Sequence, residues 1–447
     1  MSTQSSYSRL ISQTVVEANR PLTLAEIRQE VERVRSIDTA NPSATVRNAI
    51  RSDGSIASLG GRPASYVWWP RHLVDNSFRL PLSMSDIERG TLALNKEAWA
   101  ALWPDFLSRS DHREGDVTLD LAGGVMLSAR IQHLVPRQAV WGLPATPALA
   151  DWYRQQGAMP EDELVIRVLD VDSRRYAVAL CRQSERDEEA ILTRNRALAD
   201  IAEGIVRAGR PDIAYFDLIP RLIARDGYRD PLPPDPWVTV LRADLRFVVS
   251  EHSAWLSQRL VDSCEREIEI PPGPWKDDLP QGDRRKLYAE LGPGEEMDGE
   301  RRAWGDHLFD RGMDHKWADW ALEAEAYYKE ALRIDAGHAD AWVHLGNLRF
   351  EEEYFAEALA LYERGQAAAE ARTIGDPAAY ERPFWGDVVS RPFMRAVYGR
   401  ALCLWQLGRI EEARKILEWM MVLNPGDNQG ARFLLAELDD PAARWLH

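Results

Sequence analysis

Cysteine is scarce in this chain of 447 residues, and the three present, Cys181, Cys264 and Cys403, lie far apart. Isolated cysteines exclude a CxxC metal knuckle and a disulfide framework, and they fit the reducing cytoplasm. No apolar run approaches the roughly 20 residues that a membrane helix needs. The N-terminus lacks a basic stretch followed by an apolar core, so no secretion signal is expected. We expect a cytoplasmic protein that does not enter a membrane.

The sequence also lacks the common motifs of catalysis. It contains no P-loop, GxSxG, HExxH or CxxC, and no GxGxxG after a predicted strand. The nine histidines are dispersed, and lysine, which a nuclease site combines with clustered acids, is rare. We expect no enzymatic activity, no bound metal and no cofactor.

Basic charge is concentrated in one part of the chain. The net charge is −16, which argues against a protein that coats nucleic acid with its whole surface. Residues 1–80 contain ten arginines and seven acids, a balance of +3, whereas the other 367 residues hold 45 basic and 64 acidic groups, a balance of −19. A nucleic-acid interface is therefore expected near the N-terminus.

Residues 1–75 have the pattern of three helices followed by a β-hairpin. The first helix is expected over Ser6–Asn19. Thr23 can cap the second helix with Glu26 as its capping-box partner. Asn41 suits the cap of the third helix, with Pro42 in its first turn. "SIASL" and "SYVWW" then alternate like paired strands around "GGRPA".

This N-terminal region resembles the HARE-type helix-turn-helix family. The resemblance covers about residues 5–70 and rests on the "LT…I" second helix, the "P…ATV" start of the third helix and the glycine-containing wing. It implies a winged helix whose third helix enters the major groove of DNA. Winged helices also dock proteins, so an ordinary solvated helix face stays an alternative. The expected DNA-binding residues are Ser43, Thr45, Arg47, Asn48, Arg51 and Arg62.

Residues 80–182 are rich in short strands and contain one clear helix, capped by Thr146 and closed by Gly157. The order of "WGL", a helix, "PEDELVIRV" and "RYAVAL" resembles the pseudobarrel domains of plant transcription factors and restriction-enzyme effector domains. That resemblance implies loop arginines at the DNA backbone, here Arg130, Arg137, Arg174 and Arg175. The opposing interpretation is a spacer barrel with scattered arginines, and the acidic balance of the region favours it.

Residues 188–262 repeat the pattern of the N-terminal domain and predict a second winged-helix-like domain. Leu241-Arg242-Ala243-Asp244 matches Ile50-Arg51-Ser52-Asp53, and Trp255 is matched with Trp68. Val238 and Thr239 replace Arg47 and Asn48. This second copy is expected to pack or dock rather than to read DNA.

Residues 265–300 are rich in Pro, Gly and acid, which predicts a linker. After the linker, residues 301–447 show a period of 34: Ala324 and Tyr328 recur as Ala358 and Tyr362. This is the tetratricopeptide pattern of paired helices, and its later part resembles bacterial proteins related to the suppressor-of-tumorigenicity family. Such repeats form a concave groove for a peptide or helix. The expected partner-binding residues are Asn347, Arg395, Tyr398 and Trp405.

The sequence thus predicts a multidomain α+β protein, with a winged helix, a small β-barrel-like domain, a second winged helix and C-terminal tetratricopeptide repeats. Its predicted function is that of a DNA-binding regulatory or accessory protein that recruits a protein partner through the repeats. The competing hypothesis is an interaction scaffold whose winged helices and repeats all dock proteins. A homo-oligomer is compatible with either interpretation.

Overall fold

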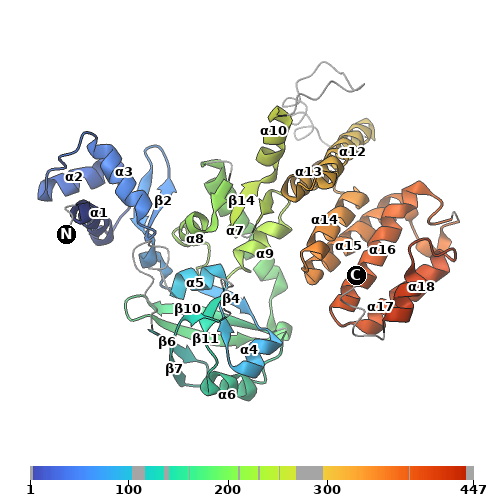
Figure 1. The fold of residues 1–447 in the computed structure, drawn as a ribbon, viewed down its shortest axis with the longest axis horizontal. Helices are drawn as coiled ribbons and strands as arrows, with labels where there is room; N and C mark the ends of the chain where they lie inside the picture. The colour runs from blue at the N-terminus through green and yellow to red at the C-terminus, as the bar shows by residue number, and fades with distance from the viewer. Residues whose placement is uncertain are drawn as a thin grey trace. The chain divides into compact units, whose positions relative to one another are not determined.

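The computed structural model describes residues 4–102, 116–134, 140–160, 162–209, 212–229, 232–250, 252–267, 295–381 and 383–438. The chain is multidomain and forms two compact units, Met1–Asp244 with Val249–Trp255, and Leu245–Val248 with Leu256–His447. The first unit contains the large sheet and the second is mainly helical (Figure 1). None of the helices in the described part of the chain is long and apolar enough to cross a membrane.

The N-terminal segment consists of three helices and a three-stranded sheet. The elements follow the chain as α1 (Gln4–Glu17), β1 (Leu22–Thr23), α2 (Leu24–Val34), α3 (Pro42–Ser52), β2 (Ile56–Gly60) and β3 (Ser65–Trp68). The sheet order is β1-β3-β2, so β3 pairs with both other strands. The β2–β3 hairpin follows α3 in the chain. The segment has its own apolar core, which includes Ile11, Ile27, Val31, Val46 and Ile50.

The ends of α2 and α3 are capped as the sequence predicts. The Thr23 hydroxyl accepts a hydrogen bond from the Glu26 N–H, and the Glu26 carboxylate accepts one from the Thr23 N–H, which completes the capping box. The Asn41 side chain accepts from the Ala44 N–H, and Pro42 occupies the first turn of α3. These caps determine where α2 and α3 begin.

The middle segment forms two separate sheets. One has the order β4-β10-β11-β6-β7 and the other the order β5-β9-β8. In the larger sheet the β11–β6 pair is parallel and the other neighbouring strands are antiparallel. The strands are β4 (Ser77–Pro81), β5 (Leu92–Ala93), β6 (Asp116–Leu121), β7 (Val125–Arg130), β8 (Gln132–His133), β9 (Trp141–Leu143), β10 (Glu163–Asp170) and β11 (Arg175–Cys181).

Two predictions for the middle segment need correction. Among the residues that the structure describes, the five-stranded sheet has β4 and β7 as its ends and does not join the other strands in one closed barrel. The described part of the segment also has three α-helices rather than one, α4 (Met84–Arg89), α5 (Lys96–Leu102) and α6 (Pro147–Gln156). Helices α4 and α5 are too short to show a clear apolar period in the sequence. The predicted Thr146 and Gly157 caps of α6 are confirmed.

The third segment has the same order of elements as the N-terminal segment. It runs through α7 (Glu188–Arg207), β12 (Asp212–Ala214), α8 (Tyr215–Ile223), α9 (Trp237–Ala243), β13 (Phe247–Val249) and β14 (Ser253–Leu256). Its sheet order, β12-β14-β13, corresponds to β1-β3-β2. In these ladders Leu22 pairs with Tyr66 and Ile213 with Ala254, so Trp255 corresponds to Val67, one residue from the predicted match with Trp68.

The second unit is built mainly from helices that pack against their neighbours in the chain. They are α10 (Ser257–Glu267), α12 (Glu295–Trp317), α13 (Ala321–Ile334), α14 (Ala339–Glu351), α15 (Phe355–Ala369), α16 (Arg391–Gln406), α17 (Ile410–Leu423) and α18 (Ala431–Glu437). Helix α12 begins at Glu295, so the last part of the predicted linker is helical. The predicted linker residues 268–294 lie outside the described residues.

Close packing of glycine against tyrosine follows the 34-residue period. A Cβ atom on Gly312 would lie 2.5 Å from the Tyr328 ring, and one on Gly346 would lie 2.8 Å from the Tyr362 ring. Both members of the second pair are 34 residues after those of the first. Because glycine has no side chain, each tyrosine ring can lie directly against the backbone of the neighbouring helix. The sequence repeat therefore corresponds to a repeated contact in the structure.

Candidate nucleic-acid interface

Helix α3 presents its polar side chains to solvent and its apolar side chains to the core. Arg47, Asn48 and Arg51 are exposed, whereas Val46 and Ile50 are almost completely buried. The 3.6-residue period of the helix produces this separation. Arg62 is also exposed and lies in the loop between β2 and β3. The structure thus places the predicted cations on the surface of α3 and of the hairpin that follows it.

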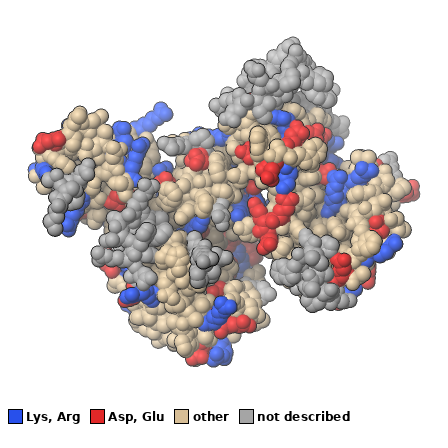
Figure 2. All heavy atoms as spheres, viewed as in Figure 1, with Lys and Arg blue, Asp and Glu red and all other residues tan. Residues whose placement is uncertain are grey.

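The arginines of α2 differ from those of α3 in their partners. Arg28 pairs with Glu32 at 2.8 Å, and Arg33 pairs with Glu30 at 2.6 Å. The side chains of Arg47, Arg51 and Arg62 form no hydrogen bond or ion pair with any residue that the structure describes. Figure 2 shows basic side chains gathered over α3 and the hairpin. These three guanidinium groups are available to an external anion.

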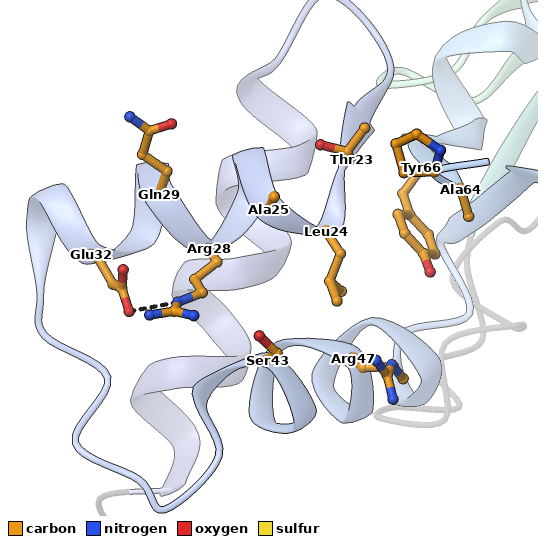
Figure 3. Close-up of a pocket in the computed structure, with 11 residues that line it drawn as sticks. Thr23, Leu24, Ala25, Arg28, Gln29, Glu32, Ser43, Arg47, Ala64 and Tyr66 are labelled. Carbon is orange, nitrogen blue, oxygen red and sulfur yellow. Dashed lines mark hydrogen bonds and ion pairs between the residues drawn. The ribbon is translucent and has the colours of Figure 1, made fainter. Parts of the chain in front are cut away.

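A shallow pocket of about 600 Å³ lies between α2, α3 and the hairpin. Ser43 and Arg47 line it from α3, Leu24 and Arg28 from α2, and Tyr66 from β3 (Figure 3). Thr45 is less available than predicted. Its hydroxyl lies 2.8 Å from that of Thr39 and donates to the Asn41 carbonyl at 3.2 Å. Ser43 and Arg47 therefore share one accessible surface, while Thr45 stabilises the start of the helix.

Arg51 lies in a different environment from Arg47. It lines a cleft of about 590 Å³ between the C-terminal end of α3, β2 and the third segment. Asp217 and Arg221 of α8 line the same cleft, so its charge is mixed. Glu32 is the one acid among the residues that line the Arg47 pocket, and it is already paired with Arg28, so Arg47 has surroundings better suited to an anion than Arg51.

Helix α8 also supports the hairpin directly, through a contact that the sequence did not predict. Arg225, which follows α8, donates a hydrogen bond to the Leu59 carbonyl of β2. Burial and the nearby Arg221 lower the pKa of Arg225. The sequence around Arg225 does not indicate this contact, because Leu59 lies 166 positions away along the chain.

The corresponding helix of the third segment, α9, is less basic. Val238 and Thr239 occupy the positions of Arg47 and Asn48, with Val238 half-buried. Arg242 is half-buried too. Two of the arginines predicted on loops of the middle segment lie at strand ends and are engaged: Arg130, the last residue of β7, pairs with Asp116 at 3.0 Å, and Arg175, the first residue of β11, pairs with Asp120 at 2.7 Å. Arg174 lies in the β10–β11 turn, and Arg137 lies outside the described residues.

The residues predicted to line a partner-binding groove differ in their exposure and in their partners. Trp405 is completely buried in the core of the second unit, so its prediction as a groove residue is wrong. It lies on the face of α16 that packs inward. Tyr398 is half-buried against that core. The Asn347 amide oxygen accepts from the Tyr362 hydroxyl at 2.7 Å, and Arg395 donates to Asp340 at 2.8 Å.

The middle and third segments share one buried carboxyl group. Glu97 of α5 accepts hydrogen bonds from the Trp237 N–H and, at 3.5 Å, from the Tyr228 hydroxyl. Burial raises the pKa of Glu97 to about 7. None of the pockets described above includes Glu97, and its partners are a helix N-terminus and a buried phenol. We interpret it as a structural contact between α5 and the start of α9.

The side chains that the structure describes include no group of three His, Cys, Asp or Glu residues that could hold a metal ion. No model of a known protein family matches this chain, and no curated protein matches it in sequence.

Proposed function

We propose that this protein is a regulatory or accessory factor that binds duplex DNA through its N-terminal segment and a protein partner through its helical second unit. The proposal for DNA rests on one observation above all. Arg47, Arg51 and Arg62 are exposed and form no ion pair within the described residues, on the helix and hairpin that follow a helix-turn-helix order. This order of elements, with the sheet order β1-β3-β2, is that expected for a winged helix.

In this interpretation α3 lies in the major groove and the hairpin lies beside it. Arg47 contacts a guanine edge or a phosphate, and Asn48 pairs with adenine. Arg62 reaches the adjacent backbone or minor groove. Arg51 contributes less to affinity than Arg47, because Asp217 shares its cleft. The Arg225 contact to Leu59 holds the hairpin in place.

For the second unit we propose the tetratricopeptide fold. The 34-residue repeat of the Gly312–Tyr328 and Gly346–Tyr362 contacts supports it. Repeats of this type bind peptides or helices of other proteins. We assign the recruitment of a protein partner to this unit.

An interaction scaffold without DNA binding is the second candidate. One observation favours it: α8 of the third segment packs against β2 of the N-terminal segment. The hairpin of a winged helix therefore already docks protein in this chain. The net charge of −16 also weakens the attraction of the whole molecule to DNA.

Binding of a fluorescein-labelled DNA duplex to the full chain, followed by anisotropy at low salt, separates the two candidates. The Arg47→Ala/Arg51→Ala double variant should bind markedly more weakly than the parent. Arg33→Ala/Arg154→Ala is the matched control, because both arginines are paired with acids and neither lines the pocket beside α3. If the parent does not bind, or if both double variants lose the same affinity, the site on α3 is refuted.

A further inference from the structure

Three arginines surround one pocket of the second unit. The pocket has a volume of about 650 Å³ and is lined by Arg302 of α12, Trp342 of α14, Arg364 of α15 and Arg372, with Gly337 and several alanines between them. No acidic residue is among the lining residues. The pocket is open to solvent, and the small side chains leave space between the arginines.

The three guanidinium groups differ in how they are held. Arg372 forms two hydrogen bonds with Asp335, one of 2.6 Å, and lies so close over Gly337 that a Cβ there would be 2.9 Å from its Nη2 atom. The Arg364 guanidinium lies over the Trp342 ring, 5.2 Å from its centroid. Arg302 and Arg364 are exposed and form no ion pair with a residue in the described ranges.

The pocket is basic although the unit that carries it is acidic. Residues 301–447 contain 18 basic and 25 acidic residues, a net charge of −7. This net charge repels a long polyanion such as DNA more strongly than a short segment with a few clustered carboxylates. The net charge of the unit therefore favours a peptide over a nucleic acid.

We infer that this pocket binds an acidic peptide segment of a partner protein, whose carboxylates pair with Arg302 and Arg364. Guanidinium groups bind carboxylates with two parallel hydrogen bonds. The Trp342 ring and the Arg364 guanidinium that lies over it offer the peptide a flat surface beside these carboxylates. This inference rests on the proposed role of the second unit in partner binding, and it names the partner's chemistry.

The pocket differs from the surface predicted from the sequence. Trp342 and Asn347 are five positions apart on α14, which places them about 140° apart around the helix. Arg395 is already paired with Asp340, whereas Arg302 and Arg364 have no such partner in the structure as described. Arg302 and Arg364 are thus available to a partner, whereas Arg395 is engaged.

Fluorescence anisotropy of a labelled oligoglutamate peptide with the full chain at low salt tests the inference. The parent should bind it, and Arg302→Glu/Arg364→Glu should bind about tenfold more weakly or not at all. The control is Arg409→Glu/Arg432→Glu, which makes the same change of charge at two exposed arginines of the same unit that lie beside acids. It should keep most of the affinity.

Three results would overturn the inference: no binding by the parent, equal loss in both double variants, or tighter binding of labelled oligothymidylate that the Arg302→Glu/Arg364→Glu change abolishes. The last result would assign the pocket to nucleic acid. The Arg47→Ala/Arg51→Ala variant should bind oligoglutamate normally. Failure of DNA binding and failure of peptide binding are therefore distinguishable.

Discussion

Glu97 should make the stability of the first unit depend on pH. Burial raises its pKa from the usual 4.5 to about 7 in the folded chain. Between these two pH values the folded state holds a proton that the unfolded state has lost, so the free energy of unfolding decreases as pH rises from 4.5 to 7 and then levels off. This difference between the pKa values of the folded and unfolded states corresponds to a decrease of about 3 kcal/mol in the free energy of unfolding. Glu97→Gln removes the titrating group, while its amide oxygen can still accept from the Trp237 N–H.

The assay is urea unfolding of the parent and of Glu97→Gln at pH 5 and pH 8, with the first unit followed by hydrogen exchange at the Trp237 amide. The two proteins should have similar stability at pH 5. At pH 8 the variant should be the more stable by up to about 3 kcal/mol. If the difference between the two proteins is the same at both pH values, the raised pKa assigned to Glu97 is wrong.

Two further predictions concern packing. Gly346→Ala should destabilise the second unit by about 1–3 kcal/mol in thermal unfolding, because the new Cβ would lie 2.8 Å from the buried Tyr362 ring. The control Gly204→Ala, whose Cβ would meet nothing within 4 Å, should be neutral or stabilising. Equal effects of the two substitutions would contradict this packing. Arg349→Met should cost about 1–3 kcal/mol in urea unfolding, because it removes one of the two buried cations that pair with the Glu325 carboxylate, the other being Lys329. Arg349→Lys, which keeps a cation beside Glu325, should lose less stability, and an equal loss in the two variants would contradict the ion pair.

Local signals in the sequence predicted most of the elements that have clear ends. The Thr23–Glu26 capping box and the Asn41 cap are confirmed, because capping depends on residues three or four positions apart. Alternation of apolar residues located the long strands, such as Glu163–Asp170. Short buried helices such as Lys96–Leu102 were missed, because almost every residue of that helix is buried and the sequence shows no polar face.

The site was less predictable than the fold, because partners distant in sequence decide which side chains are free. The helical period correctly placed Arg47 and Asn48 on the surface of α3. It gave no sign that Arg395 pairs with Asp340, 55 residues away. Nor did it show that Trp405 lies in the core, since an aromatic residue on a repeat helix suits a groove as well as an interior.

The salt dependence of DNA binding tests the central claim most directly. Removing one cation that pairs with a phosphate should reduce the slope of log K against log[salt] by about 0.9 in magnitude. We predict that the affinity of the full chain for duplex DNA falls steeply with salt, and that Arg47→Ala/Arg51→Ala flattens the slope by one to about two units. The Arg33→Ala/Arg154→Ala control should keep the parent slope. A parent protein that shows no duplex binding at low salt, or a slope unchanged by the removal of Arg47 and Arg51, would contradict the assignment of α3 to DNA.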